Sequence, residues 1–234
     1  MRINVLDHGY VAIAEAWGHG QCREIDFEAG IIEAARQSTQ GSFRGWDQDA
    51  KLLKYLYEHK HATPFEFAGM TIEVQAPIFV FREWHRHRTQ SYNEMSARYS
   101  PLPDLYYMPE LKAVEARAVF AAASHNNQAK ALADTPDELV LAQWISNVDE
   151  VYRRAERVYQ DALRCGIPKE LARIVMPVGH YSKMRASANL RNWLAFLTLR
   201  LDPAAQWEIR QYALAVGEII AVHFPRTWAL FNTK

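Results

Sequence analysis

The stretch Met70-Thr-Ile-Glu-Val-Gln-Ala76, followed at once by Pro77-Ile-Phe-Val-Phe-Arg-Glu-Trp84, places a strand directly before a helix. Residues 70–76 alternate well enough between apolar and polar side chains to predict a strand. Proline is favoured at the first position of a helix, so Pro77 predicts a helix start. An apolar face for that helix comes from Ile78, Phe79, Phe81 and Trp84. The segment Arg86-His87-Arg88 therefore begins at the end of a rigid element and continues into a loop.

Helical patterns dominate the rest of the chain. Apolar spacing predicts helices over residues 27–37, 51–60, 114–133, 137–165, 167–176, 189–200 and 203–224, with 114–133 and 137–165 as a packed pair. Strands are predicted within 3–17 and over 179–187, and residues 101–109 form an ordered loop. Thr63, Asn189 and Asp202 are predicted helix caps, the first opening a short turn with Pro64 and Glu66. The class is α+β with helix dominant, in one domain over residues 1–234.

Composition limits the function classes. Lys plus Arg and Asp plus Glu both total 27 among 234 residues, so any basic site must be local. No apolar run approaches the roughly 20 residues of a membrane span, and the N-terminus lacks a signal-peptide pattern, which predicts a soluble, cytoplasmic protein. Cys22 and Cys165 are far apart in sequence, which predicts two reduced thiols rather than a zinc or redox motif.

Residues 82–99, REWHRHRTQSYNEMSARY, are the densest set of hydrogen-bonding side chains in the chain. Guanidinium groups bind phosphate oxygens through paired hydrogen bonds, so this block predicts an anionic, nucleotide-like ligand. A solvated basic helix end is the simpler explanation for Arg86, His87 and Arg88 taken alone. His85 and His87 form a His-x-His pair, but no nearby carboxylates or thiolates complete a coordination shell, so no metal is predicted.

The same block resembles the signature of the flavin-dependent thymidylate synthases, in which Arg-His-Arg is followed by seven residues and a serine. Here these are Arg86-His87-Arg88 and Ser96, and Ser91, Asn93, Glu94, Arg98 and Tyr99 fit the extended pattern. The segments 172–177 (ARIVMP), 189–192 (NLRN) and 199–210 (LRLDPAAQWEIR) resemble the family's C-terminal half in the same order. The resemblance covers most of the chain and implies a helix-rich single domain with a small, mostly antiparallel sheet.

The resemblance also implies which residues bind which ligand. Contacts to FAD are expected from Thr63, Arg86, His87, Arg88, Glu94, Asn189, Leu190, Arg191 and Ala195. Contacts to dUMP are expected from Glu83, Trp84, His85, Arg86, Glu94, Met95, Ser96, Ala97, Arg98, Arg173 and Arg200. Arg98 is the expected phosphate partner and Arg200 the expected catalytic residue, because a permanent cation beside the uracil carbonyls and N3 stabilises charge that develops on the ring when hydride adds to C6. His61 belongs with Thr63 to a further flavin-proximal motif.

The implied activity is the conversion of dUMP to dTMP, with 5,10-methylenetetrahydrofolate as carbon donor and NADPH-reduced FAD as hydride donor. A homotetramer with active sites between subunits is implied as well. Two alternatives stay open from the residues: a related flavin- and folate-dependent pyrimidine nucleotide hydroxymethylase, and a single-stranded RNA-binding module that stacks bases on Trp84, Tyr92 and Tyr99. The neutral net charge argues against the second alternative.

The chain departs from the family pattern at three positions. Phe67 stands where histidine is frequent, Glu83 where glutamine is common, and Ala195 where asparagine or histidine often faces the flavin. A carboxylate near a phosphate repels it, so Glu83 is expected to pair with an arginine such as Arg82, to contact another donor, or to point elsewhere. Ala195 lacks a hydrogen-bonding group and is expected to loosen FAD binding.

Overall fold

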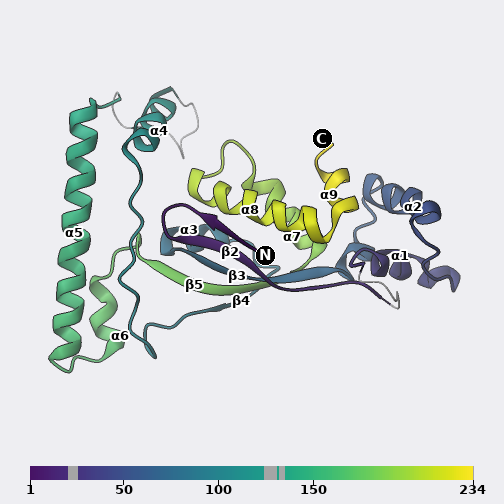
Figure 1. Cartoon of the computed structure of the whole chain (residues 1–234), viewed down its shortest axis with the longest axis horizontal. Coiled ribbons are helices and arrows are strands. Elements are labelled where there is room, and N and C mark those ends of the chain that lie inside the picture. Colours follow the sequence, from purple (N-terminus) through teal and green to yellow (C-terminus); the bar gives the residue numbers. More distant parts are fainter. Residues whose placement is uncertain (21–25, 124–130, 132–134, 234) are drawn as a thin grey trace.

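The computed structural model describes residues 1–20, 26–123, 131 and 135–233. Its centre is an antiparallel sheet with the strand order β1-β2-β3-β5-β4 (Figure 1). The strands are β1 (Arg2–Val5), β2 (Gly9–Trp17), β3 (Gly69–Pro77), β4 (Ser91–Glu94) and β5 (Tyr181–Asn189). The middle strand, β3, alternates as predicted, since Met70, Ile72 and Val74 are fully buried whereas Thr71 and Glu73 are partly exposed.

Helices cover the apolar face of this sheet. The helix α7 (Leu190–Arg200) packs against β3 and β5, and α8 (Trp207–His223) packs against β1 and β2 (Figure 1). The short helix α3 (Ile78–Trp84) follows β3 directly and also packs against α8. The core between these layers is aromatic: Trp84, Trp193, Phe196 and Tyr212 are all fully buried. The Arg-His-Arg segment therefore follows a helix that is anchored in the core.

Further helices lie at the two ends of the sheet layer (Figure 1). At one end are α1 (Ala29–Arg36), η1 (Gln37–Thr39), α2 (Trp46–Glu58) and η2 (Thr63–Glu66), with α9 (Pro225–Phe231) packed against α2. At the other end are α4 (Leu111–Ala123), α5 (Glu138–Arg164), α6 (Lys169–Ala172) and η3 (Arg173–Val175). The predicted packing of the two long helices is confirmed, because α4 contacts α5. Within the described ranges, no helix combines the length and the apolar character needed to span a membrane.

The predicted α+β class with an antiparallel sheet is confirmed, and so is the Asn189 cap, whose side-chain Oδ1 accepts a hydrogen bond from Asn192 N at 2.9 Å. The Thr63 cap is wrong, because Ala62 precedes the turn and no side chain caps it. The last long helix begins at Trp207 rather than at Pro203, because Asp202 instead accepts a hydrogen bond from Ala204 N in a turn.

Two elements were not predicted. Strand β4 lies where a loop was expected, and its pairing with β5 supplies a partner that is distant in sequence. A separate helix, α9, begins at Pro225, where the sequence predicted that the last helix ends. Part of the helix predicted over 114–133 lies outside the described residues, as does Cys22, whereas Cys165 is a free, exposed thiol.

Candidate active site

Tyr92 stabilises the turn that carries Arg86, His87 and Arg88 through two hydrogen bonds to its backbone. The Tyr92 hydroxyl donates to the backbone oxygen of His87 at 2.7 Å and to that of Trp84 at 3.2 Å. The buried Trp84 indole donates to the side chain of Gln90 at 3.0 Å, across the same turn. Burial raises the pKa of the Tyr92 hydroxyl, so Tyr92 remains a donor throughout the physiological range. The turn is therefore fixed at both of its ends.

Arg200, the last residue of α7, reaches this turn from a distant part of the sequence. Its Nε donates to Nε2 of His87 at 2.8 Å, its Nη1 to Oε2 of Glu83 at 2.9 Å, and its Nη2 to the backbone oxygen of Glu83 at 2.9 Å. The Arg200 side chain is only 15% exposed. A guanidinium group has five N–H donors, so three are used here and two remain for a ligand. We call these three residues the Glu83–His87–Arg200 cluster.

His87 is neutral in this cluster. Burial, and secondly the charge of Arg200, lower the pKa of His87 from 6.5 to about 4. Because Nε2 accepts a hydrogen bond from a group that can only donate, the proton of the neutral ring lies on Nδ1. A buried, uncharged acceptor is compatible with the adjacent cation, whereas an imidazolium would repel it.

Glu83 pairs with an arginine, as expected, but that arginine is Arg200 rather than Arg82. This pairing explains how a carboxylate is accommodated beside a basic motif. Arg82, Arg86 and Arg88 are exposed and make no ion pair with any residue that the structure describes. Their guanidinium groups are thus available to an anionic ligand.

The segment from Glu94 to Arg98 leaves the sheet edge at the end of β4 that is farther from this turn. Met95 N donates to Lys183 O at 2.8 Å, which continues the pairing of β4 with β5 by one residue. Ser96 Oγ accepts a hydrogen bond from Arg98 N at 3.3 Å, and Ala97 is buried. The Arg98 guanidinium pairs with Glu170 at 3.2 Å, with both side chains more than half exposed, so this pair is easily exchanged for a phosphate.

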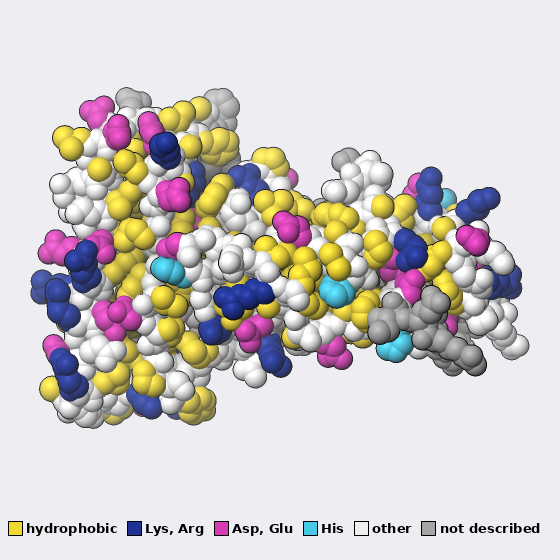
Figure 2. Space-filling model, in the orientation of Figure 1, with side chains coloured by type: hydrophobic (Ala, Val, Ile, Leu, Met, Phe, Trp, Pro, Cys, Tyr) yellow, Lys and Arg dark blue, Asp and Glu magenta, His cyan; other side chains and the backbone are white. Residues whose placement is uncertain are grey.

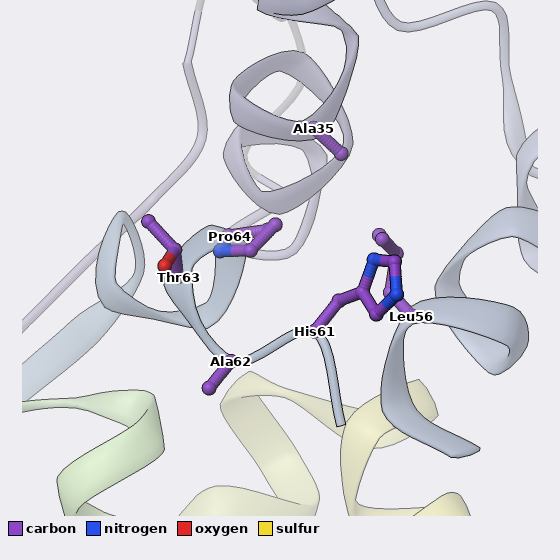
Figure 3. Close-up of a pocket in the computed structure, with 6 residues that line it drawn as sticks. All are labelled: Ala35, Leu56, His61, Ala62, Thr63 and Pro64. Carbon is purple, nitrogen blue, oxygen red and sulfur yellow. The ribbon is translucent and has the colours of Figure 1, made fainter. Parts of the chain in front are cut away.

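A second group of predicted residues surrounds a shallow cavity of about 270 Å³ between α1, α2 and η2 (Figure 3). His61, Ala62 and Thr63 line it, and the adjoining hollow of about 150 Å³ is lined by Arg191 and Leu194 as well as His61. Arg191 forms an ion pair with Glu66, and Asn189, two residues earlier, caps α7. Ala195 is exposed on α7. The residues predicted to contact FAD thus lie in two neighbourhoods, the Arg86–Arg88 turn and this cavity, except for Glu94, which ends β4.

Other predicted residues are placed differently. The side chains of Trp84 and Leu190 are fully buried in the core, so the expected contacts of these two residues with a ligand would be made by their main chain. Arg173 is exposed in η3, which packs against α5 and α6. His85 is the C-cap residue that follows α3 and lies against Tyr92, with ring centroids 4.9 Å apart.

Sequence reasoning missed the supporting roles of Gln90 and Tyr92, and no spacing rule connects Arg200 with His87. Among the described residues, no group of three or more His, Cys, Asp or Glu side chains is arranged to hold a metal ion. On the face drawn in Figure 2, basic side chains are interspersed with acidic ones and form no continuous stripe.

Comparison with known proteins matches residues 23–226 to the family described as "Thymidylate synthase complementing protein". The chain belongs to the flavin-dependent thymidylate synthase family. A member of this family from Thermus thermophilus is 38% identical over 232 residues, which cover 99% of this chain and 78% of that protein. Another, from Thermotoga neapolitana, is 34% identical and covers 99% of this chain and 94% of its own length.

The fold agrees with this membership. The crystal structure of the UMP/dUMP methylase PolB from Streptomyces cacaoi bound with 5-Br UMP superimposes with a TM-score of 0.80 at 28% sequence identity, covering 99% of this chain and 96% of that one. The family's helix-rich architecture with an antiparallel sheet is therefore the architecture of this chain.

Proposed function

We propose that this protein is a flavin-dependent thymidylate synthase that converts dUMP to dTMP. The observation that carries the proposal is the anchored guanidinium of Arg200, fixed by Glu83 and His87 with two N–H donors left over. A donor that is held in place before the reaction stabilises developing negative charge without reorganisation. Arg200 is accordingly the residue that stabilises the uracil ring as it gains electron density.

The remaining arginines bind the anionic parts of the ligands. Arg86 and Arg88 are exposed and unpaired among the described residues, which suits the pyrophosphate of a dinucleotide. Arg191 and Thr63, beside the cavity of Figure 3, suit the same cofactor. When bound and reduced, FAD supplies the hydride. Arg98, Ser96 and Arg173 are proposed to hold the dUMP phosphate.

The co-substrates and the assembly are part of the same proposal. We propose that 5,10-methylenetetrahydrofolate donates the carbon and that NADPH reduces the flavin. Arg173 lies in η3, which packs against α5 and α6, whereas Arg200 ends α7, which packs against β3, β5 and α8. From this separation we propose a homotetramer in which one subunit supplies Arg173 to the site of another. A fully active monomer in light scattering would contradict this assembly. We also propose that residues 1–234 form one domain and that the protein is cytoplasmic.

Mass spectrometry of the nucleotide product tests the reaction. FAD-loaded protein is incubated anaerobically with dUMP, methylenetetrahydrofolate and NADPH, and the expected product is dTMP. A hydroxymethylated nucleotide or unchanged dUMP would refute the proposal. Omission of the folate, and separately of NADPH, provides the controls for each co-substrate.

Neither alternative raised by the sequence is favoured. The family comparisons support a methylating synthase over a hydroxymethylase. An RNA-binding module would need several accessible aromatic rings, but Trp84 is fully buried and the Tyr92 hydroxyl is bound to the backbone, so that Tyr99 is the only exposed ring of the three residues.

A further inference from the structure

Lys60, which follows α2, has a backbone conformation that lysine rarely adopts. Its φ is 57°, in the left-handed region, where a side chain lowers stability and glycine is tolerated. Two hydrogen bonds fix this conformation: Lys60 N donates to Tyr57 O at 3.1 Å, and His61 N donates to Leu56 O at 2.9 Å. They form a Schellman motif, which closes a helix and favours glycine at the position that Lys60 occupies.

The same motif closes α5, and there glycine occupies the left-handed position. Gly166 has a φ of 75°, and its N donates to Leu163 O at 3.1 Å. The second bond runs from Ile167 N to Ala162 O at 2.9 Å. The end of α2 therefore has no need of a lysine for its own closure. Residues in unfavourable conformations cluster at functional sites, so a use for the Lys60 side chain is indicated.

Lys60 lines the hollow of about 150 Å³ that adjoins the cavity of Figure 3. Three buried apolar side chains line the same hollow: Leu56, Phe65 and Leu194. The guanidinium of Arg191, which also lines it, is paired with Glu66. Lys60 is exposed and pairs with no carboxylate among the described residues. Within that part of the chain, the hollow thus combines an apolar lining with a cation that is not neutralised.

These features fit an aromatic ring that carries a carboxylate. The pyrophosphate of FAD is better served by the exposed Arg86 and Arg88, because planar guanidinium groups bind phosphate oxygens in pairs. In the proposed function, a folate binds in the same site as the flavin. Its p-aminobenzoyl-glutamate portion is an aromatic ring followed by two carboxylates, which matches the hollow and the lysine beside it.

We propose that Lys60 binds a glutamate carboxylate of the folate co-substrate, while the apolar hollow receives the p-aminobenzoyl ring. The inference rests on the proposed function and assigns a folate contact to a residue outside the Arg-His-Arg turn. The left-handed conformation is then a loss of stability that is offset by substrate binding.

Lys60→Gly separates this role from a purely structural one. Glycine relieves the left-handed conformation, so the Tm should rise by about 2 to 4 °C. If Lys60 served only to end α2, glycine would be the better residue and folate binding would be unchanged. If Lys60 binds the carboxylate, the more stable variant binds folate less tightly.

The test measures the binding of tetrahydrofolate and of its neutral diamide, in which both glutamate carboxylates are amides. Anaerobic calorimetry is performed on the FAD-loaded protein with dUMP present. The unmodified protein should bind the acid about fivefold more tightly than the diamide, and in Lys60→Gly this ratio should fall below about twofold. Lys60→Arg keeps the cation and should preserve the ratio. Lys51→Ala, which removes an exposed lysine from α2, should leave it unchanged.

The inference is overturned if Lys60→Gly retains the ratio of the unmodified protein, or if the unmodified protein binds both compounds equally. Weaker retention of FAD by Lys60→Gly at an unchanged ratio would assign Lys60 to a flavin phosphate and would also overturn it. A ratio that depends on Lys60 in a protein that forms no dTMP would refute the proposed function alone. Formation of dTMP with an unchanged ratio would refute the inference alone, and absence of folate binding would refute both.

Discussion

The neutrality of His87 leads to a prediction about stability and pH. The folded protein holds the pKa of His87 at about 4, whereas the unfolded chain has the ordinary value of 6.5. Between these values the unfolded state binds more protons than the folded state, so stability falls as the pH falls from 6.5 towards 4. Above pH 6.5, His87 contributes nothing to the pH dependence.

The magnitude follows from the size of the shift. Each pH unit inside this window costs about 1.4 kcal/mol for one group, so acidification from about pH 7 to about pH 5 should cost about 2 kcal/mol through His87. The figure applies because the residue is only 9% exposed. The physical cause is first the burial of the ring, which disfavours its charged form, and second the repulsion between the new imidazolium and the Arg200 guanidinium.

Urea denaturation of the unmodified protein and of His87→Gln at both pH values measures this effect. Glutamine retains an oxygen that accepts from Arg200 but does not titrate, so the difference between the two proteins isolates His87. Other histidines with lowered pKa values, His180 and His223, titrate equally in both. The free-energy gap between the proteins should change by about 2 kcal/mol between the two pH values, and parallel curves would refute the reasoning.

Three further predictions concern single side chains. Arg200→Ala should lower kcat for dTMP formation by about 10² to 10³ while FAD absorbance is retained, and full activity would remove the catalytic assignment. Arg88→Ala should weaken FAD retention about tenfold in a dialysis assay, whereas Arg154→Ala, which removes an exposed arginine from α5, should not; equal retention in both would contradict the role of Arg88. Asn189→Ala should destabilise the protein by about 1 kcal/mol in urea denaturation, and Asn189→Ser should restore most of the loss, because serine also caps a helix. A similar loss in both variants would mean that the cap is not the cause.

Local signals in the sequence were sufficient for the elements that depend on near neighbours. Pro77 precedes α3 and Asn189 caps α7 because both effects act within one helical turn. The alternation over residues 70–76 predicted β3 because one face of that strand is buried. The Asp202-Pro203 pair was a weaker signal, since the same residues that open a helix also form a turn.

Features that depend on distant residues were beyond the reach of the sequence. Ser91–Glu94 is polar, and only its hydrogen bonds to β5 make it a strand. The contact between Arg200 and His87 joins positions 113 residues apart, so no spacing rule reveals it. The resemblance named both residues as ligand contacts, but it did not show that they touch, nor that Glu83 shares the same guanidinium.

The basic side chains of this site divide into one that is fixed and several that are not. Arg200 is anchored at three points and is largely buried, so the entropic cost of ordering its long side chain is met during folding. Arg86, Arg88 and Arg173 are exposed and unpaired in the part of the chain that the structure describes, so under the proposed function they would be ordered by the ligand. Rigid placement suits charge stabilisation, which fails when a donor is misplaced, whereas flexible cations suffice to attract phosphates. The negative charge of Glu83 weakens the electrostatic field of Arg200. In return, the ion pair fixes the direction of the two remaining N–H donors of Arg200 before the substrate binds.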